Sequence, residues 1–236
     1  MTCIATSYNS SFQGIGEFAS ISCHLYAAAF GVTARVNANP TIDRPIAWHR
    51  VRFIPELFDE GFEYVVWIDA DALFMDFTQD VRSLLKPGKD LYLVQHHETG
   101  DSGPVPNTGF MIIRNSEWSR WLFHSIWQLD KYVHHKWWEN AALIDLLGYR
   151  HLLGGEYEPN NDILQYIEFL PEKWNHIPRA NVHVRRPVIK HFAGRSTEER
   201  RRLMQQSAIE ASVAFAMSRR PKLLSLIMRR LKLSGE

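Results

Sequence analysis

Five consecutive apolar residues, Tyr64–Ile68 (YVVWI), stand between a turn and a pair of acids and constrain the fold more than any other feature. A run of this kind is typical of a strand buried on both faces, as in a parallel sheet with helices on each side. Strand-like and helix-like segments alternate before and after it, which is the pattern of βαβ units. We therefore predict an α/β protein in which helices flank a βαβ sheet.

Short apolar runs predict the other strands, and apolar residues at helical spacing predict the helices between them. The strands are expected at residues 2–6, 32–36, 90–95, 109–114 and 188–192. The helices are expected at residues 16–30, 48–58, 115–129, 137–147 and 196–217, with an interruption of the second near Pro55. A polar stretch rich in glycine and proline, residues 96–107, is long enough to predict a functional loop.

The composition excludes several classes of protein. The chain has 236 residues and a formal net charge of +1 at pH 7, which is far from the strongly basic balance of most nucleic-acid binders of this size. Its two cysteines, Cys3 and Cys23, lack a CxxC spacing, so neither a disulfide framework nor a zinc site is indicated. The first residues lack the pattern of a signal peptide, and no stretch reaches the ~18 apolar residues of a membrane span. We expect a cytoplasmic protein with no nucleic-acid partner.

Two acids, Asp69 and Asp71, directly follow the central apolar run. Residues two apart on a strand point to the same side, so the two carboxylates are expected to converge on one point. Like charges placed together are costly unless a cation joins them, and carboxylate oxygens suit Mg²⁺ or Mn²⁺, which bridge phosphate oxygens. The alternative is a surface turn with two solvated acids. The apolar residues on both sides of the pair favour a buried site for a divalent metal and a nucleotide diphosphate.

A phosphatase of the haloacid dehalogenase type also carries two acids after a strand. In those enzymes the pair usually follows the first strand and has Thr or Val two places beyond the second acid. Here the pair lies well inside the chain and Leu73 occupies that place. We therefore set this alternative aside.

Four segments, in order along the chain, resemble the GT-A glycosyltransferases, and most closely the retaining galactosyl/xylosyltransferases of glycosyltransferase family 34. They are residues 47–74 (AWHRVRFIPELFDEGFEYVVWIDADALF), 107–118 (NTGFMIIRNSEW), 138–143 (WENAAL) and 191–194 (HFAG). Together they span most of the chain, from Ala47 to Gly194. The resemblance implies a GT-A fold, which is an α/β, Rossmann-like fold with a mixed, mainly parallel sheet flanked by helices.

The same resemblance implies a metal site and a reaction. Asp69, Asp71 and His191 would ligate Mn²⁺, or Mg²⁺, bound to a nucleotide diphosphate sugar, with a UDP-sugar as the expected donor. An imidazole at the end of a strand is a suitable further ligand for Mn²⁺. The implied reaction transfers a hexose or pentose to a hydroxyl of a carbohydrate or glycoconjugate acceptor, with retention of configuration.

Further site residues are implied by their places in these motifs. The nucleotide base and ribose are expected at the end of the first strand, at Ala5, Thr6, Ser7 and Tyr8. Other contacts to the donor are expected from Ala70, Gly109, Gly194 and Arg195. The residues expected to face the donor sugar or the acceptor are Asn107, Glu139 and Asn140. Glu139 would be the stabiliser or nucleophile of the reaction, although an acid early in a helix also simply favours the helix dipole.

Two departures from the family pattern affect these expectations. Glu139-Asn140 stands where the family usually has Asp-Gln, which moves the carboxylate by one methylene. Arg195-Ser196-Thr197 stands where the family has a Lys-Pro pair that helps to bind the diphosphate. Arg195, or alternatively Lys190, is expected to replace that charge, because a guanidinium can hold phosphate in a bidentate way.

Two domains are predicted, a nucleotide-sugar transferase domain at residues 1–195 and a C-terminal helical extension at residues 196–236. The extension ends in a basic amphipathic tail, from Ser218 to Lys232 (SRRPKLLSLIMRRLK). This tail suits either a peripheral contact with the inner face of a membrane or packing on the domain with a solvated basic face. A non-catalytic carbohydrate- or nucleotide-binding protein on a transferase scaffold is the alternative to an enzyme.

Overall fold

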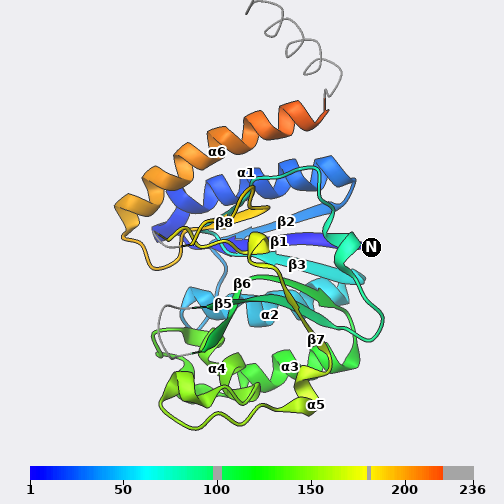
Figure 1. Ribbon diagram of the computed structural model, residues 1–236, viewed down its shortest axis with the longest axis vertical. Helices are drawn as coiled ribbons and strands as arrows, with labels where there is room; N and C mark the ends of the chain where they lie inside the picture. The colour runs from blue at the N-terminus through cyan, green and yellow to red at the C-terminus, as the bar shows by residue number, and fades with distance from the viewer. Residues whose placement is uncertain (98–102, 180–181, 220–236) are drawn as a thin grey trace, which may run out of the picture.

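The computed structural model describes residues 1–97, 103–179 and 182–219, and its centre is a six-stranded sheet in the order β2-β1-β3-β6-β5-β7 (Figure 1). The strands are β1 (Thr2–Tyr8), β2 (Thr33–Ala38), β3 (Tyr64–Ile68), β5 (Leu91–His97), β6 (Pro104–Arg114) and β7 (Ile167–Leu170). Five of them run in one direction, and β6 pairs antiparallel with both β3 and β5. The predicted mixed, mainly parallel α/β sheet is confirmed.

Helices cover both faces of this sheet (Figure 1). On one face lie α1 (Gln13–Phe30) and α6 (Thr197–Arg219), and on the other lie α2 (His49–Asp59), α3 (Glu117–Trp127) and α4 (Trp138–Leu146). The short helices are α5 (Asn161–Leu164) and the 3₁₀ turns Ser10–Phe12, Ile46–Trp48, Val81–Leu84, Asp130–Tyr132, Arg150–Leu153 and Glu172–Trp174.

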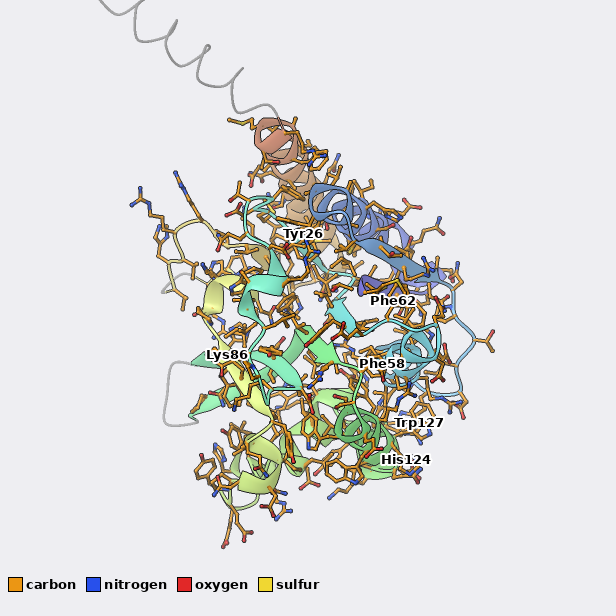
Figure 2. All side chains as sticks on the ribbon, turned by 90° about the vertical axis from the view of Figure 1, so that its right-hand side faces the viewer. Tyr26, Phe58, Phe62, Lys86, His124 and Trp127 are labelled. Carbon is orange, nitrogen blue, oxygen red and sulfur yellow. The ribbon has the colours of Figure 1, made fainter. Side chains whose placement is uncertain are left out.

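The central strand β3 sends alternate side chains into two separate cores, because successive residues of a strand point to opposite faces. Val65 and Trp67 pack with α2, α3 and α4, whereas Val66 and Ile68 pack with α1 and α6. Figure 2 marks the two sides by Tyr26, from the α1 core, and Phe58, from the α2 core. The unbroken apolar run was therefore a correct indication of a strand buried on both faces.

A second, two-stranded sheet positions the candidate site. Its strands, β4 (Ala72–Phe74) and β8 (Ile189–His191), pair antiparallel with Ala72 opposite His191. The backbone N–H of Phe192 also donates to the carbonyl of Asp71 at 2.9 Å. Residues more than a hundred positions apart in the sequence are thereby fixed beside each other. Neither β4 nor β7 was predicted.

Two predicted local features are wrong. Helix α2 is not interrupted at Pro55 but continues through it to Asp59. Proline removes one backbone donor there, yet the helix buries an apolar face with Ile54 and Leu57, and that packing holds it together. The loop predicted at residues 96–107 is largely a hairpin in the part that the structure describes, because His96 pairs with Val105 across β5 and β6. Residues 98–102 lie outside the described residues.

The C-terminal helix begins as expected. The backbone N–H of Glu199 donates to the Ser196 hydroxyl at 3.2 Å, which caps α6, and the helix packs along α1 (Figure 1). Residues 220–232 of the basic tail lie outside the described residues, and the domain boundary after residue 195 stays a prediction. No helix in the described part of the chain combines the length and apolarity needed to cross a membrane. Cys3 and Cys23 are free and buried.

Candidate active site

A cleft of about 730 Å³ opens at one edge of the central sheet. Ser7 and Tyr8 at the end of β1, Asp69 after β3, and Thr108 and Gly109 in β6 follow one another along this edge, in the order of the strands. This edge holds the carboxyl ends of the parallel strands, where ligands bind in open α/β sheets. The start of α4 forms the wall beyond β6.

The two acids lie in a tight turn between β3 and β4, because β3 already ends at Ile68. The backbone N–H of Ala72 donates to the carbonyl of Asp69 at 3.0 Å and closes this turn. The carboxylates do converge, as predicted, but the reason given from strand alternation is wrong. The turn, and not the pleat of a strand, brings Asp71 back beside Asp69.

Each acid gives one carboxylate oxygen to an arginine and turns the other toward the same imidazole. Oδ1 of Asp69 lies 2.6 Å from Nη2 of Arg50, and Oδ2 of Asp71 lies 3.0 Å from Nε of Arg200. The remaining oxygens, Oδ2 of Asp69 and Oδ1 of Asp71, lie 3.8 and 3.3 Å from Nε2 of His191. The arginines thus fix the orientation of both carboxylates.

A chain of amides fixes the imidazole. The Asn175 amide donates from Nδ2 to Oδ1 of Asn107 at 2.8 Å, so its own Oδ1 is left to accept from Nδ1 of His191 at 2.9 Å. Asn175 is fully buried. With the proton of the neutral ring held on Nδ1, the lone pair of Nε2 faces the two acids. In metal-binding histidines, the hydrogen bond made by the ring nitrogen that does not bind the metal sets the tautomer in this way.

The charges of this cluster are strongly coupled. Burial lowers the pKa of His191, but the carboxylates of Asp71 and Asp69 reverse this effect and raise the pKa above its ordinary value. Burial raises the pKa of Asp71, but His191 and Arg200 more than offset it, and the pKa of Asp71 is lowered. A cation bound here would replace the imidazole proton, so binding is expected to release a proton.

These three side chains fit a divalent metal ion. One ligand atom from each of Asp69, Asp71 and His191 lies within 4.8 Å of the other two. Gly109 makes room for the ring, because a Cβ at this position would lie 2.2 Å from Cε1 of His191. Two carboxylate oxygens and one imidazole nitrogen are a donor set that suits Mn²⁺.

Beside these candidate metal ligands, Arg50 joins a further acid, Glu139, to the site. Its Nε lies 3.2 Å from Oε1 of Glu139, and the Thr108 hydroxyl donates to the same oxygen at 3.1 Å. The other oxygen, Oε2, is buried with no hydrogen-bond partner among the described residues. Burial raises the pKa of Glu139 to about 7, although Arg50 opposes the shift. The guanidinium of Arg50 thus pairs with two carboxylates, those of Asp69 and Glu139.

Residues 34–204 match the family model for nucleotide-diphospho-sugar transferases. The chain belongs to the nucleotide-diphospho-sugar transferase family. It is therefore a glycosyltransferase, as the sequence motifs predicted. No curated protein matches this transferase in sequence.

Solved structures share the fold of this transferase. A glycosyltransferase involved in glycosylation of the major capsid of PBCV-1 superposes with a TM-score of 0.67 at 14% identity, covering 87% of this chain and 98% of that one. The glycosyltransferase GlyE of Streptococcus pneumoniae TIGR4 gives 0.55 at 14% identity, over 91% of this chain and 62% of that one. An active-site mutant of LgtC gives a TM-score of 0.54 at 12% identity, covering 86% of this chain and 95% of that one. The predicted GT-A fold is confirmed.

The cleft of this transferase includes most of the residues predicted from sequence. The lining includes Ser7, Tyr8, Asp69, Ala70, Asp71, Asn107, Gly109, Glu139, Asn140, His191 and Gly194. Ala5 and Thr6 are instead fully buried in β1 and do not belong to the lining of the cleft. Asn140 accepts from the backbone N–H of Thr108 at 3.0 Å and donates to the carbonyl of Pro106 at 3.2 Å, so it fixes the start of β6.

Neither of the two cations expected to bind the diphosphate belongs to the lining of the cleft. Arg195 donates to Glu199 and to the carbonyl of Pro178, each at 2.7 Å, and Lys190 pairs with Glu210 at 2.8 Å. Arg200, one turn into α6, lines the cleft in their place.

Sequence reasoning missed Arg50, Arg200 and Asn175. Arg50 lies inside the segment that carries the family resemblance, but nothing in its spacing distinguishes it from Arg52. Arg200 is the first of three consecutive arginines, and only the packing of α6 decides which of them faces the cleft.

Proposed function

We propose that this transferase is a metal-dependent, retaining enzyme that moves a hexose or pentose from a UDP-sugar to an acceptor hydroxyl. Mn²⁺, or Mg²⁺, would be held by Asp69, Asp71 and His191. The orientation of the two carboxylates supports this proposal. Each acid contacts an arginine with one oxygen and directs the other oxygen toward Nε2 of His191. A site arranged in this way needs little rearrangement to accept a cation.

The diphosphate is proposed to lie against both the metal ligands and the neighbouring Arg200. A divalent cation bound by the three ligands would offset the charge of the leaving diphosphate as a Lewis acid. Arg200 lines the cleft with 15% of its side chain exposed, and it forms an ion pair with Asp71. Its guanidinium can bind phosphate oxygens in a bidentate way, which is the role expected from sequence for Arg195.

The nucleotide is proposed to occupy the β1 end of the cleft, beside Ser7 and Tyr8. The Ser7 hydroxyl lies 2.9 Å from Nδ1 of the buried His49, which fixes its direction. Burial lowers the pKa of His49 to about 4, so this imidazole is neutral at physiological pH. A neutral, fixed partner makes Ser7 a directed hydrogen-bonding group for a base or ribose.

Retention is proposed to follow from attack on the face that the leaving group occupies. The bond from the anomeric carbon to the diphosphate oxygen breaks, the acceptor oxygen bonds to the same face, and the acceptor proton passes to the leaving phosphate oxygen. Positive charge develops on the sugar as the first bond breaks. We propose that Glu139, whose Oε2 has no partner among the described residues, stabilises this charge. Asn107 and Asn140 would fix the part of β6 that lines the cleft beside the sugar.

The test is hydrolysis of a panel of nucleotide sugars with Mn²⁺, Mg²⁺ or EDTA, by the wild type, Asp71→Asn and a control, Asp130→Asn. Asp130 is a surface acid with 79% of its side chain exposed. We expect slow, metal-dependent hydrolysis of one donor, lost only in Asp71→Asn, and an α-configured sugar product by proton NMR from an α-linked donor.

Hydrolysis that continues in EDTA would contradict the metal site, and a β-configured product would contradict retention. Donor binding with no turnover in any condition would favour the non-catalytic alternative.

A further inference from the structure

Trp138 is the feature of the cleft that the proposed chemistry does not use. Its side chain is 44% exposed, and of the exposed large hydrophobic residues in the described ranges it is the one that lines the cleft. Its neighbours are anchored, because Trp137 packs against the α2 core and Glu139 is buried. An exposed indole in the lining of a cleft is an apolar surface that a ligand can cover.

The backbone at Trp138 adopts a left-handed conformation, with φ of 46° at the first residue of α4. A bulky residue seldom occupies this region, and the conformation costs about 1–3 kcal/mol. Hydrogen bonds hold the turn, since the N–H of Trp138 donates to the carbonyl of His135 at 2.9 Å and the N–H of Asn140 to that of Trp137 at 3.0 Å. Glycine would fit this turn better than tryptophan does.

The position of Trp138 separates it from the nucleotide. Along the sheet edge the β1 residues come first, the acids follow at β3, and β6 with α4 comes last. The next residue, Glu139, forms an ion pair with Arg50, which also pairs with Asp69. The indole therefore lies beyond the acids, at the end of the cleft opposite the proposed nucleotide site.

We propose that Trp138 is the platform on which the acceptor sugar stacks, and that the acceptor is a pyranoside whose ring presents an apolar face of C–H groups. An aromatic face buries such a patch and aligns the ring while the hydroxyls stay free for reaction. This inference rests on the proposed function and names the acceptor class of the same site.

The experiment measures binding of the methyl glycosides of glucose and galactose by saturation-transfer NMR, with UDP and Mn²⁺ present. The variants are Trp138→Ala, Trp138→Phe and Trp121→Ala; Trp121 is a matched control, 47% exposed on α3 and outside the cleft lining. We expect Trp138→Ala to weaken glycoside binding at least about fivefold, Trp138→Phe to keep most of it, and Trp121→Ala to match the wild type.

The melting temperature of Trp138→Gly separates this role from a structural one. We expect it to equal or exceed that of the wild type, because glycine relieves the left-handed backbone, while glycoside binding is lost. A lowered melting temperature, or equal glycoside binding by Trp138→Ala and the wild type, would overturn the inference. So would a wild type that binds UDP with Mn²⁺ but none of the glycosides. A wild type that binds no UDP would instead contradict the proposed function.

Discussion

The proposed metal site, formed by Asp69, Asp71 and His191, and the entrance, which is the end of the cleft beside α4, are two parts of one cleft and are built in opposite ways. At the metal centre His191 is only 3% exposed, and its ring is fixed by Asn175 on one side and faced by two acids on the other. At the entrance Trp138 is 44% exposed and stands on a strained backbone.

We interpret this contrast as a division of roles between the two parts of the cleft. A centre that stabilises developing charge works best when its dipoles are already oriented, which requires buried groups with several partners. A surface that selects an acceptor needs only a face of the right shape and can remain exposed. Substitutions at the centre should therefore reduce stability and chemistry together, whereas those at the entrance should affect acceptor binding.

The largest effect is expected from Arg50→Met. Arg50 is the buried partner of both Asp69 and Glu139, and its loss leaves the buried carboxylate of Glu139 and the partly buried carboxylate of Asp69 without their guanidinium partner. We expect the free energy of unfolding, measured in urea, to fall by about 3–5 kcal/mol. The control is Arg52→Met on the same helix, where the arginine is exposed. A decrease no larger than that of the control would mean that Arg50 does not hold the centre together.

Asp71→Asn tests the charge of the centre with little change of shape. The amide keeps the volume but loses the charge that faces His191 and Arg200. We expect donor turnover to fall by about 10²–10³-fold. Turnover close to that of the wild type would show that the reaction does not depend on this carboxylate.

The pH dependence of stability tests Glu139, at the boundary of the two regions. Its pKa is raised from 4.5 to about 7 in the folded protein, so the unfolded chain loses this proton first as the pH rises. Its contribution to stability is fully present below pH 4.5 and is lost as the pH rises through about 7, by at most about 3 kcal/mol. The free energy of unfolding of Glu139→Gln, measured in urea, should therefore change less between pH 5 and 7.5 than that of the wild type. Parallel curves would contradict the raised pKa.

Gly109→Ala is expected to have the smallest effect. The added methyl would lie 2.2 Å from the His191 ring and 2.8 Å from Oδ1 of Asn107, so the imidazole must shift. We expect the affinity for UDP with Mn²⁺ to fall about tenfold by calorimetry, as for other changes that misplace a metal ligand. In Gly14→Ala the methyl meets only the end of the flexible Arg201 side chain, and this control should bind normally. Equal affinity in both variants would contradict the close packing of His191.

The sequence predicted those strands and helices whose formation depends mainly on neighbouring residues. The run Tyr64–Ile68 predicted a doubly buried strand, and the helix predicted at residues 16–30 does end at Phe30, where Gly31 follows with φ of 66°. The family motifs predicted Asp69, Asp71 and His191, which the fold brings together.

The missing parts depend on tertiary contacts. Strand β4 has three residues and exists because β8 pairs with it across the chain, so no local pattern could predict it. Arg200 reaches the cleft only because α6 packs on α1. The strained backbone of Trp138 contradicts local preference, as is expected at a functional site.

The central claim is that Asp69, Asp71 and His191 hold a divalent metal together with a nucleotide diphosphate. The most direct measurement is the electron paramagnetic resonance signal of free Mn²⁺, titrated with protein in the presence of UDP. We predict that the wild type removes this signal as about one ion binds per chain, and that His191→Ala leaves most of it. Equal loss of the signal with both proteins, or no loss with the wild type, would contradict the claim.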